Sequence, residues 1–158
     1  MGTSQPRNHT TVDTELAHVR VQQRLSAVDQ RYTKGRRQLV ELLLAVARPA
    51  TLPELAQLGP DLPTSSMYRN LELLERHGLV QRIATGAGHA HFELSEPILG
   101  HHHHLICVTC GRVDDIELDD AAERIVERAL ESAAATVGFV PLHHTADLHG
   151  HCQTCDTE

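Results

Sequence analysis

Apolar residues recur at helical spacing in four segments of the first half of the chain, which predicts four helices. These segments cover residues 13–30, 33–47, 51–59 and 67–77. Signals at their ends support the assignment: Thr33 can cap the second helix, and Thr51 and Glu54 form a capping box for the third. Gly78 stands where a helix C-terminal glycine belongs. The first half of the chain is therefore expected to be mainly helical.

Two short runs with strand character follow the fourth helix and predict a β-hairpin. They span residues 79–84 and 89–94 and flank a glycine-containing turn. Helices followed by a hairpin are the order of a winged helix-turn-helix domain, to which we assign residues 1–94, with 1–12 as a flexible polar tail. Pro97 and Gly100 interrupt the periodicity of residues 95–100, so we expect a hinge there.

The remaining segment, residues 101–158, predicts a smaller α/β unit. Its pattern indicates strands at 101–108, 112–117 and 140–148 and a helix at 120–136. Asp120 and Glu123 have the spacing of a capping box for that helix. The expected fold class is α+β, with an N-terminal winged helix-turn-helix domain joined to a small C-terminal α/β domain.

Charge and histidine are distributed unevenly along the 158 residues, whose net charge is −7. Residues 1–82 hold 11 Lys and Arg against 8 Asp and Glu, whereas residues 83–158 hold 3 against 13, together with ten of the 13 histidines. This asymmetry suggests a mildly basic module and an acidic, histidine-rich module suited to cations. No apolar run approaches the length of about 18 residues that a membrane span needs, and the start lacks a signal-peptide core, so we expect a cytoplasmic protein without a membrane partner.

All four cysteines fall into two Cys-x-x-Cys pairs, Cys107 with Cys110 and Cys152 with Cys155. Four thiolates in a tetrahedral arrangement are the usual closed structural Zn²⁺ site, and in a reducing cytoplasm a metal is favoured over disulfides. Unrelated core thiols or a disulfide pair are the alternatives. Because 41 residues separate the pairs, the zinc ion would staple the end of the chain back to the first strand of the second unit.

Four consecutive histidines, His101, His102, His103 and His104, lie in a predicted strand directly before the first cysteine pair. Because side chains alternate across a strand, the first and third point one way and the second and fourth the other. One short run can therefore supply two separate metal sites. An expression tag or a solvated polar run is the alternative, but the run is internal.

Further nitrogen and oxygen donors flank the histidine run. Strand alternation places His89, His91 and Glu93 on one face of the wing, although each of them alone is typical of a surface residue. More donors follow in the second unit, namely Asp115, Glu117, Glu123, His143 and His144. Imidazole and carboxylate ligands accommodate Fe²⁺, Mn²⁺, Ni²⁺, Co²⁺ or Zn²⁺, so the ligand type does not select the metal.

Candidate DNA contacts gather at the starts of the fourth and second helices. A recognition helix presents its N-terminal end to DNA, where hydroxyls, Tyr and Arg contact phosphates and base edges. The candidates on the fourth helix are Ser65, Ser66, Tyr68, Arg69 and Asn70. On the second helix, Lys34, Arg36 and Arg37 could clamp the DNA backbone. A solvated charged face is the alternative interpretation.

Three strings of residues resemble the ferric uptake regulator (Fur) family. They are Tyr68-Arg69-Asn70-Leu71 after three helices, the histidine run continued as Leu-Ile-Cys-Val-Thr-Cys-Gly to Gly111, and the terminal Gly150-His151-Cys152-x-x-Cys155. The similarity covers roughly residues 32–155. It implies a homodimeric, metal-activated repressor with no enzymatic activity and no small-molecule substrate. Residues 101–158 would form its metal-binding dimerisation domain, and its partner would be a palindromic double-stranded DNA operator.

The resemblance also assigns three sets of metal ligands. Those matching the structural zinc site are Cys107, Cys110, Cys152 and Cys155. Those matching a regulatory site between the domains are Glu93 from the wing, His102, His104 and Asp115. Those matching a second site in the dimerisation domain are His101, His103, Glu123 and His144. Family members often supply a further histidine near the start of the third helix; this chain has none there, so His91 or His89 is expected to substitute, and Glu96 competes with Glu93.

The metal in the regulatory site stays open between Fe²⁺, Zn²⁺ and Mn²⁺. The lack of a free cysteine favours an iron-type sensor, whereas His103, where iron sensors often carry Asp, favours zinc, and Asp115 resembles the peroxide-sensing branch. The leading hypothesis is an iron-sensing repressor in which metal fixes two recognition helices at the spacing of an operator. The alternatives are a zinc-uptake or peroxide-sensing regulator and, from other classes, a metal storage protein or a metalloenzyme; no His-Glu-x-x-His motif supports an enzyme.

Overall fold

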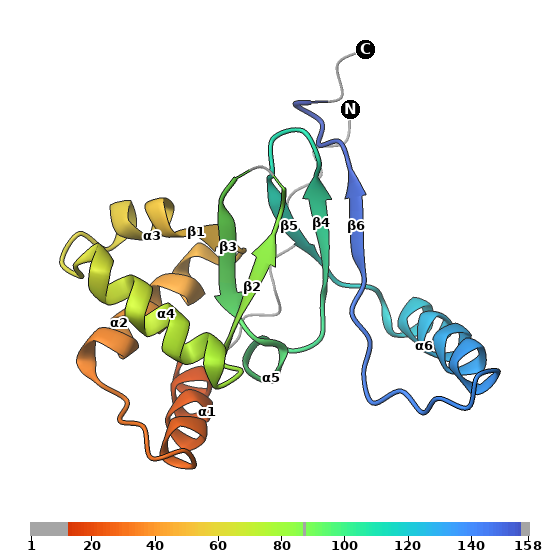
Figure 1. Cartoon of the computed structure of the whole chain (residues 1–158), viewed down its shortest axis with the longest axis horizontal. Helices are drawn as coiled ribbons and strands as arrows, with labels where there is room; N and C mark the ends of the chain where they lie inside the picture. Colours follow the sequence, from red (N-terminus) through yellow and green to blue (C-terminus); the bar gives the residue numbers. More distant parts are fainter. Residues whose placement is uncertain (1–12, 87, 156–158) are drawn as a thin grey trace.

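The computed structural model describes residues 13–86 and 88–155, and the tail expected at 1–12 lies outside them. In chain order its elements are α1 (Thr14–Ser26), α2 (Lys34–Val46), β1 (Ala50–Thr51), α3 (Leu52–Leu58), α4 (Thr64–Arg76), β2 (Val80–Ala84), β3 (Ala90–Leu94), α5 (Glu96–Leu99), β4 (His103–Cys107), β5 (Val113–Ile116), α6 (Asp120–Ala135) and β6 (Asp147–Gly150). Figure 1 shows helices α1–α4 beside the β1-β3-β2 sheet, followed by the β5-β4-β6 sheet and then α6. The predicted α+β class with a winged helix is confirmed.

The N-terminal helices begin and end close to their sequence signals. The Thr33 hydroxyl caps α2, the Thr51 capping box opens α3, and Gly78 after α4 has a φ of 65°, a conformation that favours glycine. Helix α4 starts at Thr64, one turn earlier than the expected residue 67, because Pro63 serves as its N-cap residue with a φ of −55°. The short β1, which the sequence pattern did not predict, pairs with β3 and completes the wing sheet.

One apolar core holds the N-terminal part together. Its largest fully buried side chains come from α1 to α5 and the wing, namely Val21, Leu25, Leu39, Val40, Leu55, Met67, Leu71, Leu74, Leu79, Leu94 and Ile98. Burying one such side chain contributes about 1.5–3 kcal/mol. Helix α4 therefore packs one face on this core and leaves its other face exposed to solvent.

Residues 95–100, where the sequence predicted a hinge, contain the one-turn helix α5. Ile98 is fully buried in the N-terminal core, and Arg20 Nη1 on α1 donates a hydrogen bond to the Ile98 carbonyl at 3.0 Å. Gly100 follows with a φ of 99° and turns the chain toward β4. Helix α5 is therefore fastened to the winged-helix part, and the chain changes direction directly after it.

The C-terminal part is built around β4, which pairs with β5 antiparallel and with β6 parallel. The strand expected at 140–148 is wrong for most of its length, because only residues 147–150 form β6 opposite residues 104–107 of β4. Val140 and Leu142 are 82% and 94% exposed, so neither packs on the sheet. The N-cap of α6 is Asp119 rather than Asp120, since the Asp119 carboxylate accepts hydrogen bonds from two backbone N–H groups of the first turn.

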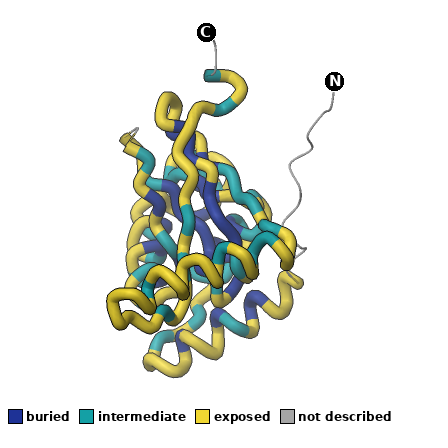
Figure 2. The backbone as a smooth tube through the Cα atoms, turned by 90° about the vertical axis from the view of Figure 1, so that its right-hand side faces the viewer, coloured by how far each residue is buried: buried dark blue, intermediate teal, exposed yellow. Residues whose placement is uncertain are grey.

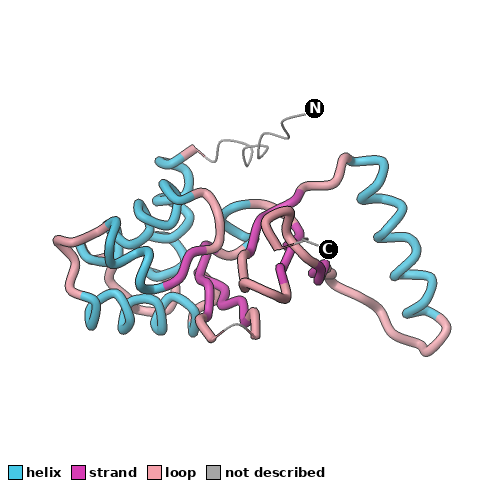
Figure 3. The backbone as a smooth tube through the Cα atoms, turned by 90° about the horizontal axis from the view of Figure 1, so that it is seen from above, coloured by secondary structure: helices cyan, strands magenta, loops and turns pink. Residues whose placement is uncertain are grey.

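Helix α6 stands away from the rest of the chain. It has no buried residue, and Figure 3 shows it separated from the β5-β4-β6 sheet. Figure 2, which views the molecule from the α6 side, shows exposed α6 in front of the buried strands. Large apolar side chains are exposed on α6, on the segment after it and on β6, namely Ile125, Leu130, Val137, Phe139, Val140, Leu142 and Leu148. Such an exposed apolar region is typical of a protein–protein interface.

The two parts of the molecule touch through a small buried cluster. Ile83 on β2 packs with Ile106 on β4 and Val113 on β5. This contact brings the wing against the strands that carry the histidine run and the first cysteine pair. Among the described residues, no helix has the length and apolar character needed to cross a membrane.

Candidate functional site

The histidine run divides between two clusters, as strand alternation predicted. His102 and His104 join Glu93 and Asp115 in one group, which we call the interdomain cluster. His101 and His103 join Glu123 and His144 in another, which we call the second cluster. Within each group, one ligand atom per residue lies within 4.8 Å of all the others.

The interdomain cluster joins the wing to the C-terminal sheet. Glu93 Oε1, from β3, lies 3.1 Å from His102 Nε2 and 2.7 Å from His104 Nε2. Asp115, paired opposite His104 on β5, places Oδ1 at 3.9 Å from His104 Nε2. The Glu93 and His102 side chains are each only 3% exposed, so these charged groups face one another away from solvent.

The contacts within this cluster shift the pKa values of its members in opposite directions. Burial would raise the pKa of Glu93, but hydrogen bonds from His102 and His104 outweigh burial and lower the pKa to about 2. Burial would lower the pKa of each histidine, but the contact with Glu93 raises it, to about 9 for His102. At neutral pH the cluster thus contains the Glu93 carboxylate beside a protonated His102 ring, and a metal ion must displace that proton to bind the ring.

The donor set fits a divalent metal ion. Two imidazoles and two carboxylates are ligands that Fe²⁺, Mn²⁺ and Zn²⁺ accept. Glu93 Oε2 is buried and, within the part of the chain that the structure describes, has no hydrogen-bond partner, so a ligand atom is available. The second ring nitrogens are also engaged: His102 Nδ1 lies 3.0 Å from the Gly100 carbonyl and His104 Nδ1 lies 2.9 Å from Asp147 Oδ1. Contacts of this kind orient metal-binding histidines.

Sequence reasoning missed Gln81, which also belongs to this site. Its Nε2 contacts Glu93 Oε1 and lies 3.3 Å from His104 Nε2. A glutamine belongs to no metal-binding motif, and only its pairing opposite Glu93 on the neighbouring β2 strand could have pointed to it. The amide can present either its oxygen or its nitrogen to the cluster, so Gln81 can adjust to what binds there.

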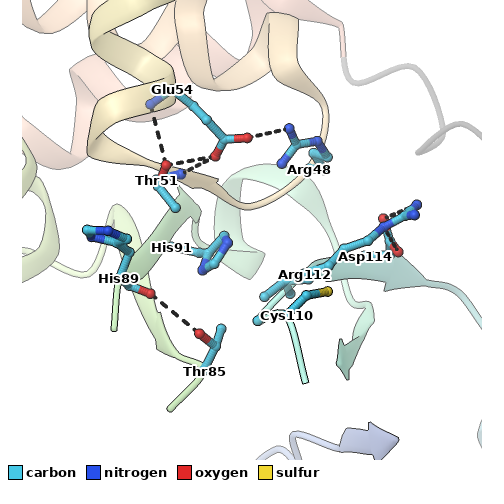
Figure 4. A pocket seen from close by; sticks show the side chains of 11 residues that line it. Arg48, Thr51, Glu54, Thr85, His89, His91, Cys110, Arg112 and Asp114 are labelled. Atoms are coloured by element: carbon cyan, nitrogen blue, oxygen red, sulfur yellow. Dashed lines mark hydrogen bonds and ion pairs between the residues drawn. The ribbon is translucent and has the colours of Figure 1, made fainter. Parts of the chain in front are cut away.

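His91, expected to complete the regulatory site, does not join the interdomain cluster. It lies two residues before Glu93, and two residues of a strand span about 6.6 Å, which carries its ring away from the histidine run. Its ring faces a separate cavity of about 430 Å³ between the wing and the first cysteine pair (Figure 4). The other lining residues include His89, Arg48, Glu54 and Arg112. Arg48 and Glu54 are paired there at 2.7 Å.

The second cluster is centred on one carboxylate. Glu123, in the first turn of α6, lies 3.2 Å from His101 Nε2, 3.1 Å from His103 Nε2 and 2.9 Å from His144 Nε2. Burial would raise the pKa of Glu123, but the hydrogen bond from His103 and the charges of the three rings lower it. Glu96, which the sequence offered as a rival of Glu93, instead lies 2.5 Å from His101 Nδ1.

The four cysteines meet where β4 and β6 end side by side. None forms a disulfide, their Sγ atoms gather within 4.8 Å, and Cys110 Sγ lies 3.8 Å from Cys152 Sγ. Thiolates bound to a tetrahedral zinc ion at about 2.3 Å would lie about 3.8 Å apart. Hydrogen bonds from the backbone N–H groups of Cys110 and Cys152 lower the pKa of Cys107 to about 6, whereas the side-chain contacts with Cys152 and Cys110 raise the pKa of Cys155 to about 12, so Cys107 loses its proton more readily than Cys155.

The candidate DNA contacts lie at the N-terminal ends of α4 and α2. On α4, Ser65 and Arg69 are exposed, Tyr68 is 53% exposed and Ser66 is half-buried. On α2, Lys34 is exposed and Arg36 is half-buried, with its guanidinium bonded to a backbone carbonyl. A Cβ placed on Gly35 would lie 3.6 Å from Asn70 Nδ2, so the start of α2 adjoins the middle of α4.

A winged helix whose wing carboxylate enters a histidine cluster of a second, cysteine-knuckle domain defines a metal-binding regulator of the DNA-binding class. Comparisons with known proteins agree with this assignment. The ferric uptake regulation protein of Legionella pneumophila is 34% identical over 106 residues, covering 67% of this chain and 73% of its own. The peroxide operon regulator of Bacillus subtilis is 30% identical over 96 residues, covering 61% of each chain.

A solved structure and a family model lead to the same family. The ferric uptake regulator of Vibrio cholerae superposes with a TM-score of 0.65 at 27% identity, over 83% of this chain and 98% of that one. The model of the ferric uptake regulator family matches residues 27–148. The chain belongs to the ferric uptake regulator family. It is therefore a transcription regulator, and the expectation that it is not an enzyme is confirmed.

Proposed function

We propose that this protein is a metal-responsive repressor that binds palindromic operator DNA as a metal-loaded homodimer. One observation carries the proposal: Glu93 of the winged helix meets His102, His104 and Asp115 of the C-terminal domain in one buried cluster. We assign these four residues to the regulatory site. A metal ion bound there supplies ligand bonds between the two domains.

The regulatory step follows from which residues each domain contributes. His104 and Asp115 belong to the C-terminal sheet and His102 directly precedes it, whereas Glu93 belongs to wing strand β3. A metal ion gains the Glu93 ligand only when the domains are closed, so it favours the closed arrangement by the affinity that Glu93 adds. The two recognition helices of a dimer are then held at a fixed spacing, which a palindromic operator can match.

We assign DNA recognition to the exposed starts of α4 and α2. Ser65, Ser66, Tyr68 and Arg69 would meet phosphates and base edges, and Lys34 with Arg36 would hold the DNA backbone. Support comes from the exposure of the α4 residues and from the contact of the start of α2 with Asn70 on α4. The uneven charge of the chain adds to it, since most of the Lys and Arg residues lie in residues 1–82. DNA binding of this kind goes with the cytoplasmic location expected from the sequence.

We assign dimerisation to the C-terminal domain, residues 101–158. Helix α6 and the segment after it expose Ile125, Phe139, Val140 and Leu142 to solvent, at 61–94%. Exposing these side chains costs free energy that a second copy of the same surface would recover. The four cysteines would hold structural Zn²⁺ at the end of β4 and β6, which stabilises the sheet behind α6.

For the regulatory metal we propose Fe²⁺, with Mn²⁺ or Zn²⁺ as alternatives. The interdomain cluster offers nitrogen and oxygen atoms and no thiolate. This donor set suits Fe²⁺ better than it suits Zn²⁺, for which a thiolate ligand would be selective. The similarity to ferric uptake regulation proteins supports iron, and the similarity to a peroxide operon regulator supports peroxide sensing as the second candidate. Asp115 favours that second candidate, because the resemblance pairs this residue with the peroxide-sensing branch.

A selection experiment tests the proposal without knowledge of the operator. The full-length protein, with zinc in its cysteine site, is loaded with Mn²⁺ as an air-stable substitute for Fe²⁺ and used to select duplexes from a random DNA pool. We expect a palindromic sequence whose binding disappears when Mn²⁺ is removed. Selection of the same sequence with equal affinity in the absence of Mn²⁺ would contradict a metal-responsive repressor.

A further inference from the structure

The second cluster has a contact that reaches beyond the C-terminal domain. His101 lies between two carboxylates, with Glu123 of α6 at 3.2 Å from Nε2 and Glu96 of α5 at 2.5 Å from Nδ1. Glu96 does not join the group of mutually close ligand atoms formed by His101, His103, Glu123 and His144. It therefore contacts the ring from the side opposite to the ligand group, which is the position of a residue that orients a metal-binding histidine.

The helix that carries Glu96 is part of the winged-helix domain. Ile98 of α5 is fully buried in the N-terminal core, Arg20 of α1 donates to the Ile98 carbonyl, and the Ser95 N–H donates to the Leu79 carbonyl at 3.0 Å. The Glu96 side chain is thus connected, through α5, to α1 and to the core on which α4 packs. Glu96 thus connects the winged-helix domain to the second cluster, as Glu93 connects it to the interdomain cluster.

Between Glu96 and His101 the chain turns at Gly100. This residue has a φ of 99°, its N–H donates to the Glu96 carbonyl at 2.7 Å, and a Cβ placed on it would meet no atom of the described residues within 4 Å, so no side chain packs against this point of the turn. The Glu96–His101 contact spans this turn from one side to the other. Rotation of the chain at Gly100 would break the contact, and a fixed His101 ring would keep it in place.

We propose that Glu96 is a positioning residue for His101 and that, through it, metal at the second cluster locks the turn between the two domains. This inference rests on the proposed function, because it makes the second cluster a further control of the same switch. A metal ion on His101 Nε2 fixes the ring, the ring holds Glu96, and Glu96 holds α5 with the winged helix. The second cluster then does more than stabilise the dimerisation domain.

The test isolates the second cluster in the full-length protein with zinc in its cysteine site. His102→Ala with His104→Ala removes the interdomain cluster, so that Co²⁺ added as a probe binds at the second cluster alone. Co²⁺ affinity is read from its visible absorption, and hydrogen exchange of the backbone amides of residues 98–100 reports on the turn. Glu96→Ala and Glu96→Gln are compared with Glu75→Gln, which removes a carboxylate from the far end of α4.

We expect Glu96→Ala to weaken Co²⁺ binding by about 10- to 100-fold, the usual effect of losing the partner of a metal-bound histidine. Glu96→Gln should weaken it less, because the amide oxygen still accepts from Nδ1–H, and Glu75→Gln should not change it. Co²⁺ should slow exchange at residues 98–100 in the parent protein but not in Glu96→Ala. The inference is overturned if the parent binds no Co²⁺, if Glu96→Ala keeps the parent affinity, or if Co²⁺ slows exchange equally in both.

Failure of this inference and failure of the proposed function give different results. The proposed function fails when the wild-type protein binds its selected DNA equally well with and without Mn²⁺. The inference is judged on Co²⁺ affinity and amide exchange, neither of which involves DNA. If the inference holds, Glu96→Ala in an otherwise wild-type chain should also raise the Mn²⁺ concentration needed for DNA binding.

Discussion

Replacing Glu93 with glutamine should weaken the metal-free protein by an amount that depends on pH. Glu93→Gln keeps the size of the side chain and removes its charge. In the protein with empty histidine clusters, the Glu93 carboxylate lies 3.1 Å from His102 and 2.7 Å from His104, and both the Glu93 and His102 side chains are 3% exposed. Because solvent barely screens this contact, its loss should be visible in the free energy of unfolding.

The pKa shifts of Glu93 and His102 give the same free energy for their contact. The pKa of Glu93 is lowered from 4.5 to about 2, and that of His102 is raised from 6.5 to about 9. Each pH unit corresponds to about 1.4 kcal/mol, so either shift represents about 3 kcal/mol, counted once because both shifts include the Glu93–His102 contact. Removing one partner of a buried ion pair typically costs about 3–5 kcal/mol, which agrees.

The sign of the pH dependence follows from the same pKa values. Because the pKa of His102 is raised, its contribution to the free energy of unfolding is fully present below pH 6.5 and is lost as the pH rises through about 9. The lowered pKa of Glu93 means that its contribution is present above pH 4.5 and is lost as the pH falls through about 2. The contact therefore stabilises the protein most between pH 4.5 and 6.5.

Urea unfolding of the zinc-containing protein, with the histidine clusters empty, measures the effect. We expect Glu93→Gln to lower the unfolding free energy by about 3 kcal/mol at pH 6 and by less than about 1 kcal/mol at pH 9. Glu75→Gln, which removes a carboxylate outside the cluster, should change it by no more than about 0.5 kcal/mol at either pH. A Glu93→Gln loss that is equal at pH 6 and pH 9, or absent at pH 6, would show that the charged contact of Glu93 with the histidines does not stabilise the protein.

Three further changes test the other assignments. Cys107→Ser should unfold or monomerise the C-terminal domain, because structural zinc contributes on the order of 10 kcal/mol to small zinc-dependent folds. A dimeric variant without bound zinc, detected by sedimentation and metal analysis, would contradict a structural zinc site at the four cysteines. Arg69→Ala should weaken binding of the selected DNA and reduce its salt dependence by about one phosphate contact, with unchanged metal content; equal affinity at all salt concentrations would move the DNA surface elsewhere. Leu142→Asp places a charge at a position that is 94% exposed in the single chain. It should hardly change the stability of a monomer but should dissociate a dimer built on this face. A stable dimer in sedimentation would place the interface elsewhere.

Much of the fold and of the candidate site could be predicted from short-range pattern. The period of two along a strand was enough to divide His101 and His103 from His102 and His104, because that division depends only on local backbone geometry. The Thr51 capping box and the glycine after α4 are local for the same reason. The identities of helices α1 to α4 and α6 followed from residues that lie close together in the sequence, whereas α5 was not predicted.

The features that failed depend on contacts between distant residues. His91 shares a strand face with Glu93, yet its position along β3 leaves it in a cavity beside Arg48 rather than beside the histidine run. Gln81 enters the interdomain cluster through strand pairing, which no motif records. Residues 140–146 carry apolar side chains that suggest a strand, but they form none, and their exposure points instead to a surface that a second chain would cover.

DNA binding by two double variants shows whether a metal ion between the domains controls this protein. Fluorescence anisotropy with the selected duplex is measured against Mn²⁺ concentration for His102→Ala with His104→Ala and for His101→Ala with His103→Ala. We expect the first variant to fail to bind the duplex at any Mn²⁺ concentration that saturates the wild type, while it remains a dimer with zinc in its cysteine site. The second variant should bind the duplex but require more Mn²⁺. Equal loss of DNA binding in both variants, or wild-type binding by the first, would contradict a regulatory metal site between the domains.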